Sequence, residues 1–255
     1  MSAGALIAGR PGEPTVVLIH GLASSFRVWD KIIPRIEEST SVVAVQLESE
    51  HSIGSDADDV AALLTSRAVV VGHSRGALVA TALAERRPEL VAALALLCPP
   101  WSRASRLSAR SPVERALAVP GLGDVLWAMA SGDRQRAAQQ SAFAPHVTVP
   151  EQFVADARGR GRRNFVRSSR AIDTYLESRD LAARLRNLSV PIELVFGELD
   201  ARVARPTQQF SGLRRAQVTE LPGVGHTPPW EDPDVVADLI MRTVAARSDT
   251  AATDC

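Results

Sequence analysis

The chain has 255 residues, 45% of them hydrophobic, which is enough for one large folded domain. Its 29 basic and 29 acidic side chains cancel, which argues against nucleic acid or an anionic membrane as a partner. No stretch resembles a signal peptide or a membrane span, and two cysteines are too few for a disulfide framework, so we expect a cytoplasmic protein.

The first part of the chain alternates between strand and helix patterns. Apolar, β-branched runs predict buried strands, and the segments between them predict helices. Residues 3–8 add a weaker strand candidate. The predicted strands are 15–19, 41–47, 68–72 and 91–97, and the predicted helices are 27–37, 56–65 and 76–86. This alternation indicates βαβ units, so we predict an α/β fold with a mostly parallel, doubly wound sheet.

The pattern changes at residue 99, and an all-helical insert of this kind is typical of a lid over a cleft. The helical segments of the insert are 112–118, 125–144, 150–157 and 164–188. Strand patterns return at 190–196 and 216–221, and a helix at 234–247 follows. The predicted organisation is an α/β core of residues 1–98 and 190–247, a helical lid of residues 99–189, and a disordered tail of residues 248–255.

The five residues Gly72-His73-Ser74-Arg75-Gly76 join a predicted strand to a predicted helix. A serine in such a tight turn points out of the sheet at the positive end of the helix, and the two glycines leave room for the backbone. This context makes Ser74 a candidate nucleophile.

A nucleophilic serine needs a base and a group that orients the base. His226 follows the last predicted strand, and a carboxylate follows the strand before it, at Asp200 or Glu198. These positions lie at the carboxyl ends of strands, where parallel sheets form ligand crevices. The order serine, acid, histidine is that of an α/β-hydrolase sheet, and the backbone amides of Leu22 and Arg75 are the candidate oxyanion donors.

The chain resembles the α/β-hydrolase superfamily, and within it the single-domain, lid-bearing group of esterases, carbon–carbon bond hydrolases and cofactor-free haloperoxidases. The matching segments are His20-Gly21, Gly72–Gly76, Gly197–Asp200 and Gly225-His226. The resemblance implies a serine hydrolase without a cofactor, in which Ser74, Asp200 and His226 are catalytic. It favours Asp200 over Glu198 as the acid.

Two features depart from the family pattern. The stretch after the second buried strand usually reads Asp-x-x-Gly-x-Gly-x-Ser, but here it starts at Gln46 and has lost most of the glycines, so we expect a different loop path. The residue after the nucleophile is commonly small or apolar, and here it is Arg75. Its guanidinium pairs either with a carboxylate of the fold or with an acidic group of a substrate.

Aromatic residues of the insert and of the loop after the histidine predict an apolar cleft for the substrate. These aromatic residues are Trp101, Trp127, Phe143, Phe153 and Trp230, and the candidates for binding substrate are Trp101, Trp127, Phe143 and Trp230. The arginine-rich run 158–163 is interpreted as a solvated face of the lid, with an anion or nucleic-acid contact as the alternative. Because no set of His, Cys, Asp or Glu has metal-ligand spacing, no metal is expected.

The function predicted from these residues is hydrolysis of a small or medium ester or lactone with an apolar portion, through an acyl-enzyme on Ser74. One alternative is a carbon–carbon bond hydrolase that acts on a keto acid, in which an arginine binds the acid. A second alternative is a non-catalytic ligand-binding protein on the same fold. The expected partner is a small-molecule substrate, and the expected state is a monomer or a homodimer.

Overall fold

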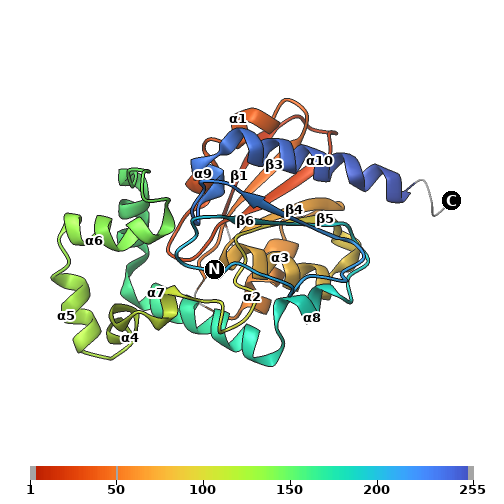
Figure 1. Ribbon diagram of the computed structural model, residues 1–255. Coiled ribbons are helices and arrows are strands. Elements are labelled where there is room, and N and C mark those ends of the chain that lie inside the picture. The colour runs from red at the N-terminus through yellow and green to blue at the C-terminus, as the bar shows by residue number, and fades with distance from the viewer. Residues whose placement is uncertain (1–3, 50, 252–255) are drawn as a thin grey trace.

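The computed structural model describes residues 4–49 and 51–251, and seven strands in this part of the chain form one sheet (Figure 1). The strands are β1 (Gly4–Gly9), β2 (Thr15–Ile19), β3 (Ser41–Gln46), β4 (Ala68–His73), β5 (Val91–Leu97), β6 (Ile192–Gly197) and β7 (Ala216–Leu221). Their order is β1-β3-β2-β4-β5-β6-β7. Among these strands only β1, at one edge, is antiparallel to its neighbour. The predicted α/β fold with a mostly parallel sheet is therefore confirmed.

Helices cover both faces of the sheet, and this explains why the strands are so apolar. The covering helices are α1 (Ile33–Ile36), α2 (Ile53–Ala61), α3 (Arg75–Arg86), α8 (Leu181–Leu185) and α10 (Pro233–Ala251). In β2, Val17 and Ile19 pack into one layer with α2, α3 and α8, whereas Val16 and Leu18 pack into the other with α1 and α10. Every residue of β4 and β5 is buried, as is usual for strands inside a parallel sheet.

Two predicted core helices have other bounds in the structure. The segment 27–37 is a short 3-10 helix, η1 (Phe26–Trp29), followed by α1, because Pro34 has no N–H and cannot continue a preceding helix. The helix predicted at 56–65 is α2, which begins earlier, at Ile53. Ser52 caps it there, since its Oγ accepts a hydrogen bond from the N–H of Ser55 at 3.0 Å.

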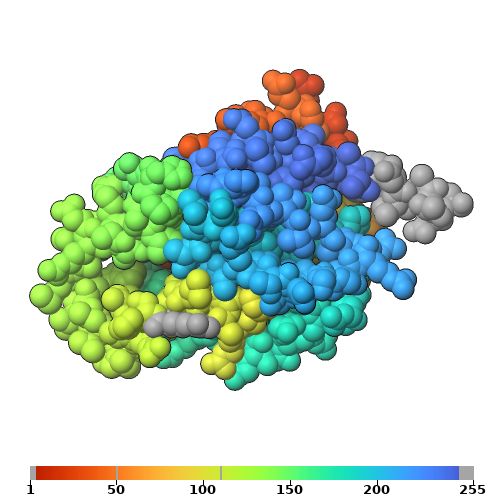
Figure 2. All heavy atoms as spheres, viewed as in Figure 1, coloured from red at the N-terminus to blue at the C-terminus, as the bar shows by residue number. Residues whose placement is uncertain are grey.

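The insert between β5 and β6 is helical in its described part. Its helices before α8 are α4 (Pro112–Leu117), α5 (Leu122–Ala128), α6 (Gly132–Gln139) and α7 (Glu151–Ser178). The segment 125–144 does not form one helix, because Ser131 caps a new one, α6. α7 joins two predicted segments across a kink at Gly161, where φ is 76°. α4, α5 and α6 lie to one side of the sheet, and this part of the insert forms a lobe of green atoms beside the main body (Figures 1 and 2).

The closing helix α10 extends to Ala251, beyond the predicted end at residue 247. Residues 248–251, which the sequence assigns to a disordered tail, continue this helix because no glycine or proline ends it before them. The rest of that tail, residues 252–255, lies outside the described residues. None of the helices in the described part of the chain combines the length and the apolar character that crossing a bilayer requires.

Candidate active site

Ser74 lies in the turn between β4 and α3. Its backbone has φ 52° and ψ −116°, a conformation that costs free energy in an L-residue and persists only when its surroundings fix it. The turn is tight: a Cβ on Gly72 would lie 2.4 Å from the carbonyl oxygen of Gly76, and a Cβ on Gly76 would lie 2.3 Å from that of Ile19. Because only glycine fits at both positions, this short pattern builds a strained serine turn.

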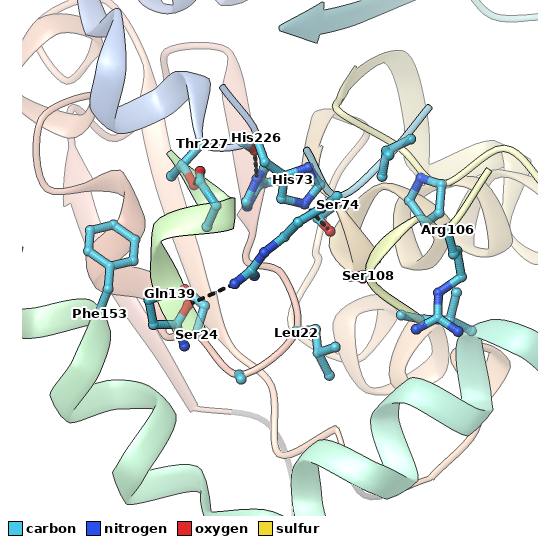
Figure 3. Close-up of a pocket in the computed structure, with 16 residues that line it drawn as sticks. Leu22, Ser24, His73, Ser74, Arg106, Ser108, Gln139, Phe153, His226 and Thr227 are labelled. Carbon is cyan, nitrogen blue, oxygen red and sulfur yellow. Dashed lines mark hydrogen bonds between the residues drawn. The ribbon is translucent and has the colours of Figure 1, made fainter. Parts of the chain in front are cut away.

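His226 and Asp200 continue a chain of hydrogen bonds that begins at Ser74. His226 Nε2 lies 2.9 Å from Ser74 Oγ, and His226 Nδ1 lies 2.7 Å from Asp200 Oδ2. Figure 3 shows His226 and Ser74 side by side. Ser74, Asp200 and His226 follow β4, β6 and β7, so all three come from the carboxyl edge of the sheet. The structure brings together the three residues that the sequence singles out.

The carboxylate of Asp200 is held by the backbone as well as by His226. Its Oδ1 accepts hydrogen bonds from the amides of Arg202 and Val203 at 2.7 and 2.9 Å. Burial alone would raise the pKa of Asp200, but the charge and hydrogen bond of His226 together with the two amides hold the pKa below its ordinary value. Glu198, the alternative acid, turns away and accepts a hydrogen bond from a backbone amide in an exposed position.

Two other histidines are buried near Ser74, and both are neutral. Burial and the charge of His226 lower the pKa of His73 to about 3, and its Nε2 donates to the carbonyl oxygen of His226 at 2.7 Å. Burial lowers the pKa of His20 to about 3 as well. His20 Nδ1 donates to the carbonyl oxygen of Gly21 at 2.8 Å, and its Nε2 accepts from the amide of Leu47 at 3.1 Å. These contacts position the backbone.

Arg75 presents its amide and its side chain to different surroundings. It is the first residue of α3, so its N–H has no acceptor within the helix and is available to a ligand beside Ser74. Its guanidinium is fully buried, pairs with Asp56 of α2 and donates to Ser49 Oγ at 2.9 Å. Of the two partners that the sequence leaves open for this guanidinium, the structure shows the carboxylate of the fold. Leu22, after β2, lines a cavity next to Ser74 (Figure 3).

This cavity has a volume of about 50 Å³ and lies against Ser74 and His226. Its lining combines apolar side chains with two arginines. The other lining residues are Leu22, Ala23, Ser24, His73, Pro100, Arg106, Ser108, Gln139, Ala142, Phe153, Ile172, Arg202, Val203 and Thr227. Ligand pockets usually have volumes of about 300–1,000 Å³. A substrate therefore requires the lining to rearrange.

None of the four aromatic residues expected to bind substrate lines this cavity. Trp101 donates its ring N–H to a backbone carbonyl, and Trp127 packs against another ring of the insert. Phe143 and Trp230 pack against Phe153, with ring centroids 5.0 and 5.2 Å away. Phe153 is the member of this cluster that reaches the cavity (Figure 3). The sequence predicts that these rings line an apolar cleft, but it does not reveal which of them faces Ser74.

The sequence does not identify the polar lining residues Arg106, Gln139 and Arg202. Arg202 could have been found from the sequence, because it follows Asp200 by two residues in a loop at the carboxyl edge of the sheet. Arg106 and Gln139 belong to the insert and lie in no recognisable motif.

The arginine-rich run 158–163 is only partly a solvated face. Arg158 and Arg163 are exposed. Arg160 is half-buried and donates to the carbonyl oxygen of Ser24 at 3.2 Å, and Arg162 donates to a carbonyl oxygen of α4 at 2.8 Å. These two residues attach α7 to neighbouring elements.

One group of potential metal ligands occurs among the described residues. The ligand atoms of Cys98, Asp200 and His226 lie within 4.8 Å of one another. Two of these donors are already bonded to each other, and burial raises the pKa of the Cys98 thiol well above its usual range. Because a metal needs deprotonated, available donors, these residues do not fit a resident metal ion.

The sheet topology, the serine turn and the Ser74–His226–Asp200 hydrogen bonds define an α/β hydrolase. The chain belongs to the alpha/beta hydrolase family, whose model matches residues 16–239.

The proteins that this chain is similar to include esterases and hydrolases. A pimeloyl-[acyl-carrier protein] methyl ester esterase of Neisseria meningitidis serogroup B is 32% identical over 200 residues, which cover 73% of this chain and 74% of that protein. The fold is similar to that of a putative aryl esterase from Burkholderia cenocepacia, with a TM-score of 0.76, 21% identity, and 95% of each chain covered. It is also similar to that of a 2-hydroxy-6-oxo-6-phenylhexa-2,4-dienoate hydrolase from Rhodococcus sp. strain RHA1, with a TM-score of 0.76, 22% identity, and 96% and 95% coverage.

Proposed function

We propose that the protein is a serine hydrolase that cleaves a small or medium carboxylic ester or lactone with an apolar portion. Ser74 is the nucleophile, His226 is the general base, and Asp200 orients His226. The observation that carries the proposal is the unbroken chain of hydrogen bonds, 2.9 Å from Ser74 to His226 and 2.7 Å from His226 to Asp200, beside a cavity.

His226 is the donor or the acceptor in each proton transfer of the proposed reaction. Ser74 Oγ attacks the ester carbonyl carbon, and its proton passes to His226 Nε2. Asp200, which its lowered pKa keeps ionised, stabilises the resulting imidazolium. The proton then goes to the leaving alcohol oxygen as the acyl-enzyme forms. Water next attacks the acyl carbon and gives a proton to His226, which returns it to Ser74 as the acid leaves.

The negative charge on the carbonyl oxygen needs N–H donors in the transition state. The amide of Arg75 is one, because it is an orphan donor at the N-terminus of α3. The amide of Leu22 is the second, because this residue follows β2 and lines the cavity beside Ser74. Two such donors stabilise the oxyanion more than the neutral carbonyl of the ground state, and this difference lowers the barrier.

The substrate class rests on the cavity and on the relatives. Leu22, Phe153 and Ile172 give the lining an apolar part, which suits an apolar acyl or alcohol group. The curated relative from Neisseria and the structural neighbour from Burkholderia are named esterases. The insert of residues 99–189, apart from α8, acts as a lid in this proposal, because the cavity of about 50 Å³ between the insert and the sheet must widen to admit an ester. α8 packs in the layer that covers the sheet and stays with the core.

The setting that we propose is a cytoplasmic enzyme acting on a small molecule. Cys98 is buried as a free thiol, which suits a reducing compartment. The balanced charge of the chain gives nucleic acid no electrostatic advantage as a ligand.

The two alternative functions have less support. A carbon–carbon bond hydrolase would use the same serine and histidine, and a neighbour of that kind shares the fold, but at 22% identity this likeness concerns the fold alone. A non-catalytic binding protein has no need for a serine at φ 52° that is hydrogen-bonded to a histidine and a carboxylate. The strained turn at Ser74 therefore favours a catalytic protein over a binding protein.

Labelling with a fluorophosphonate probe tests the proposal. The wild type is expected to react covalently, and Ser74→Ala and His226→Ala are expected not to react. Ser108→Ala is the matched control, because Ser108 lines the same cavity outside the hydrogen-bond chain, and this variant is expected to be labelled. A folded wild type that resists the probe, or a Ser74→Ala variant that still reacts, would refute an activated Ser74.

A further inference from the structure

Arg202 brings into the cavity a positive charge whose contacts within the described residues are all neutral. Its Nε donates to Ser141 Oγ at 3.1 Å, and its Nη2 donates to Gln139 Oε1 at 3.1 Å and to the carbonyl oxygen of Ala138 at 3.5 Å. Ala138 and Gln139 belong to α6, and Ser141 belongs to the short 3-10 helix η4 (Gln140–Ala142). The guanidinium therefore bridges the loop after β6 to the insert, and the labelled Gln139 marks this point in Figure 3.

The other arginine of the cavity has its charge matched. Arg106 pairs with Asp173, and its Nη2 lies 3.4 Å from Glu114 Oε1. It also donates to Ser169 Oγ at 2.8 Å. Two carboxylates of the insert thus accompany Arg106. Arg202 has no carboxylate in contact in the described part of the chain, so the two arginines are not equivalent.

Among the described residues that line the cavity none is an aspartate or a glutamate, so none of them offsets the charge of Arg202. Asp200 is close in sequence, but both of its oxygens are engaged: Oδ2 with His226, and Oδ1 with the amides of Arg202 and Val203. Burial lowers the pKa of the Arg202 guanidinium, because the cation has lost water, while Asp200 and Glu114 oppose this from a distance. A partly desolvated guanidinium bound to neutral oxygens gains free energy when an anion replaces them.

We propose that Arg202 binds a carboxylate of the substrate in place of Gln139 and Ser141, and that the substrate is an ester with a second, free carboxylate, such as the half-ester of a dicarboxylic acid. This inference rests on the proposed function of Ser74. A guanidinium forms two parallel hydrogen bonds with a carboxylate, and these are stronger than bonds to neutral acceptors. One cation without a carboxylate partner also matches a singly charged carboxylate better than a doubly charged phosphate.

The replacement of Gln139 and Ser141 by a substrate carboxylate at Arg202 also links substrate binding to the opening of the cavity. Arg202 holds the insert to the loop after β6 through Gln139 and Ser141. When a substrate carboxylate takes the guanidinium, the insert loses these two hydrogen bonds. The insert is then freer to move away from Ser74, and the cavity of about 50 Å³ can widen around the ester group.

The test compares monomethyl with dimethyl esters of succinic, glutaric and adipic acid at pH 7.5. The two esters of each acid share an acyl chain and differ in one negative charge. For at least one chain length, the wild type is expected to have a higher kcat/KM for the monomethyl ester. In Arg202→Gln the ratio of kcat/KM for the monomethyl ester to kcat/KM for the dimethyl ester is expected to fall at least tenfold. Arg202→Lys is expected to retain part of the preference for the monomethyl ester, because lysine keeps the positive charge.

Arg205→Gln is the matched control, since Arg205 lies on the same loop, is exposed and pairs with Glu220. Its ratio is expected to equal that of the wild type. Thermal unfolding of each variant checks that the fold survives. Equal ratios in the wild type and Arg202→Gln at every chain length would overturn the assignment of Arg202, while turnover of the dimethyl esters would leave the proposed esterase function standing.

A second measurement does not depend on turnover. Free adipate is expected to slow fluorophosphonate labelling of Ser74 in the wild type. Dimethyl adipate at the same concentration is expected to slow the labelling less. In Arg202→Gln, adipate is expected to give no protection against labelling. If adipate does not slow labelling of the wild type, and the wild type shows no preference for monomethyl esters, the inference about Arg202 is overturned. The proposed esterase function would remain standing. Absence of both labelling and turnover would overturn the proposed function and, with it, the inference.

Discussion

Arg75, the residue after Ser74, forms a buried ion pair with Asp56, in which the two side chains are 0% and 3% exposed. Ser49 Oγ accepts another hydrogen bond from the same guanidinium at 2.9 Å, whereas Arg75 Nε has no partner in the described part of the chain. Burial raises the pKa of Asp56 and lowers that of Arg75, and their mutual attraction opposes both shifts. The N-terminus of α3, which carries the serine turn, is thus fixed to α2 by a charged pair.

Removing one partner of this pair should be far more costly than removing an exposed ion pair. Asp56→Asn leaves the Arg75 cation buried without an anion, and we expect the free energy of unfolding to fall by about 3–5 kcal/mol. Asp58 lies on α2 like Asp56, but its ion pair with Arg86 of α3 is exposed. Asp58→Asn should therefore lower the free energy of unfolding by less than about 1 kcal/mol. Urea unfolding at pH 7 measures both changes. Equal losses in the two variants would contradict a structural role for Asp56.

The two candidate acids should have unequal effects on catalysis. Asp200→Asn removes the charge that stabilises the His226 imidazolium and changes which nitrogen of His226 carries the proton, so we expect kcat/KM for a short-chain ester to fall by roughly 10³–10⁴-fold. Glu198→Gln should stay within about twofold, because Glu198 contacts an exposed amide and not the histidine. Steady-state kinetics of the two variants checks this, and a larger loss in Glu198→Gln would reverse the assignment.

Adding a methyl group at Gly76 and at Gly159 should have opposite effects on stability. A Cβ on Gly76 would lie 2.3 Å from the carbonyl oxygen of Ile19, so Gly76→Ala must distort β2 or α3, and we expect a loss of about 3 kcal/mol or more. A Cβ on Gly159, in the helical part of α7, meets no atom within 4 Å. Gly159→Ala should therefore stabilise the protein by about 0.5–1 kcal/mol. Thermal unfolding of the two variants measures both changes. A Gly76→Ala variant as stable as the wild type would show that the turn is less tight than described.

The features that follow from local patterns could be predicted from the sequence. The strands β5 and β7 have the predicted bounds, because continuous or alternating apolar runs identify strands directly. The approach of Ser74, His226 and Asp200 also follows from the sequence. Once the strands are parallel, their carboxyl ends share one edge, and residues that directly follow three strands must meet there.

The features that depend on packing between distant segments could not be predicted in this way. Trp127 and Phe143 lie in an insert whose helices point their side chains according to tertiary contacts, and periodicity alone does not say which side faces the sheet. The sequence leaves the partner of the Arg75 guanidinium open for a similar reason, since Asp56 comes from another helix. The bonds from Arg202 to Gln139 and Ser141 join residues more than 60 positions apart, and no motif marks them.

The two buried neutral histidines predict how stability depends on pH. The pKa of His20 and of His73 is about 3 in the folded protein, against an ordinary value of 6.5. Between these values the unfolded chain binds a proton at each position and the folded protein does not, so the free energy of unfolding falls as the pH falls. Each histidine contributes up to about 1.4 kcal/mol per pH unit within this window.

Urea unfolding between pH 7 and pH 4 measures this dependence. The slope of the free energy of unfolding against pH should be smaller in His20→Asn and in His73→Asn than in the wild type, and smallest in the double variant. Wild-type stability that stays constant across this range would contradict the neutral, buried state of both rings.

Phe153 should control which acyl chains the enzyme accepts, because it lines the cavity, whereas its two aromatic neighbours Phe143 and Trp230 do not. Its ring packs between Phe143 and Trp230 and lines the space beside Ser74. Phe153→Ala makes room for a longer acyl chain, so we expect the ratio of kcat/KM for p-nitrophenyl octanoate to that for p-nitrophenyl butyrate to rise by about tenfold. A single methylene group in an apolar pocket is already worth roughly 1–3 kcal/mol of discrimination. Trp127→Ala is the matched control, since Trp127 packs elsewhere in the insert and should leave the ratio unchanged. A ratio that responds to Trp127 and not to Phe153 would mean that the substrate binds on another face of the insert.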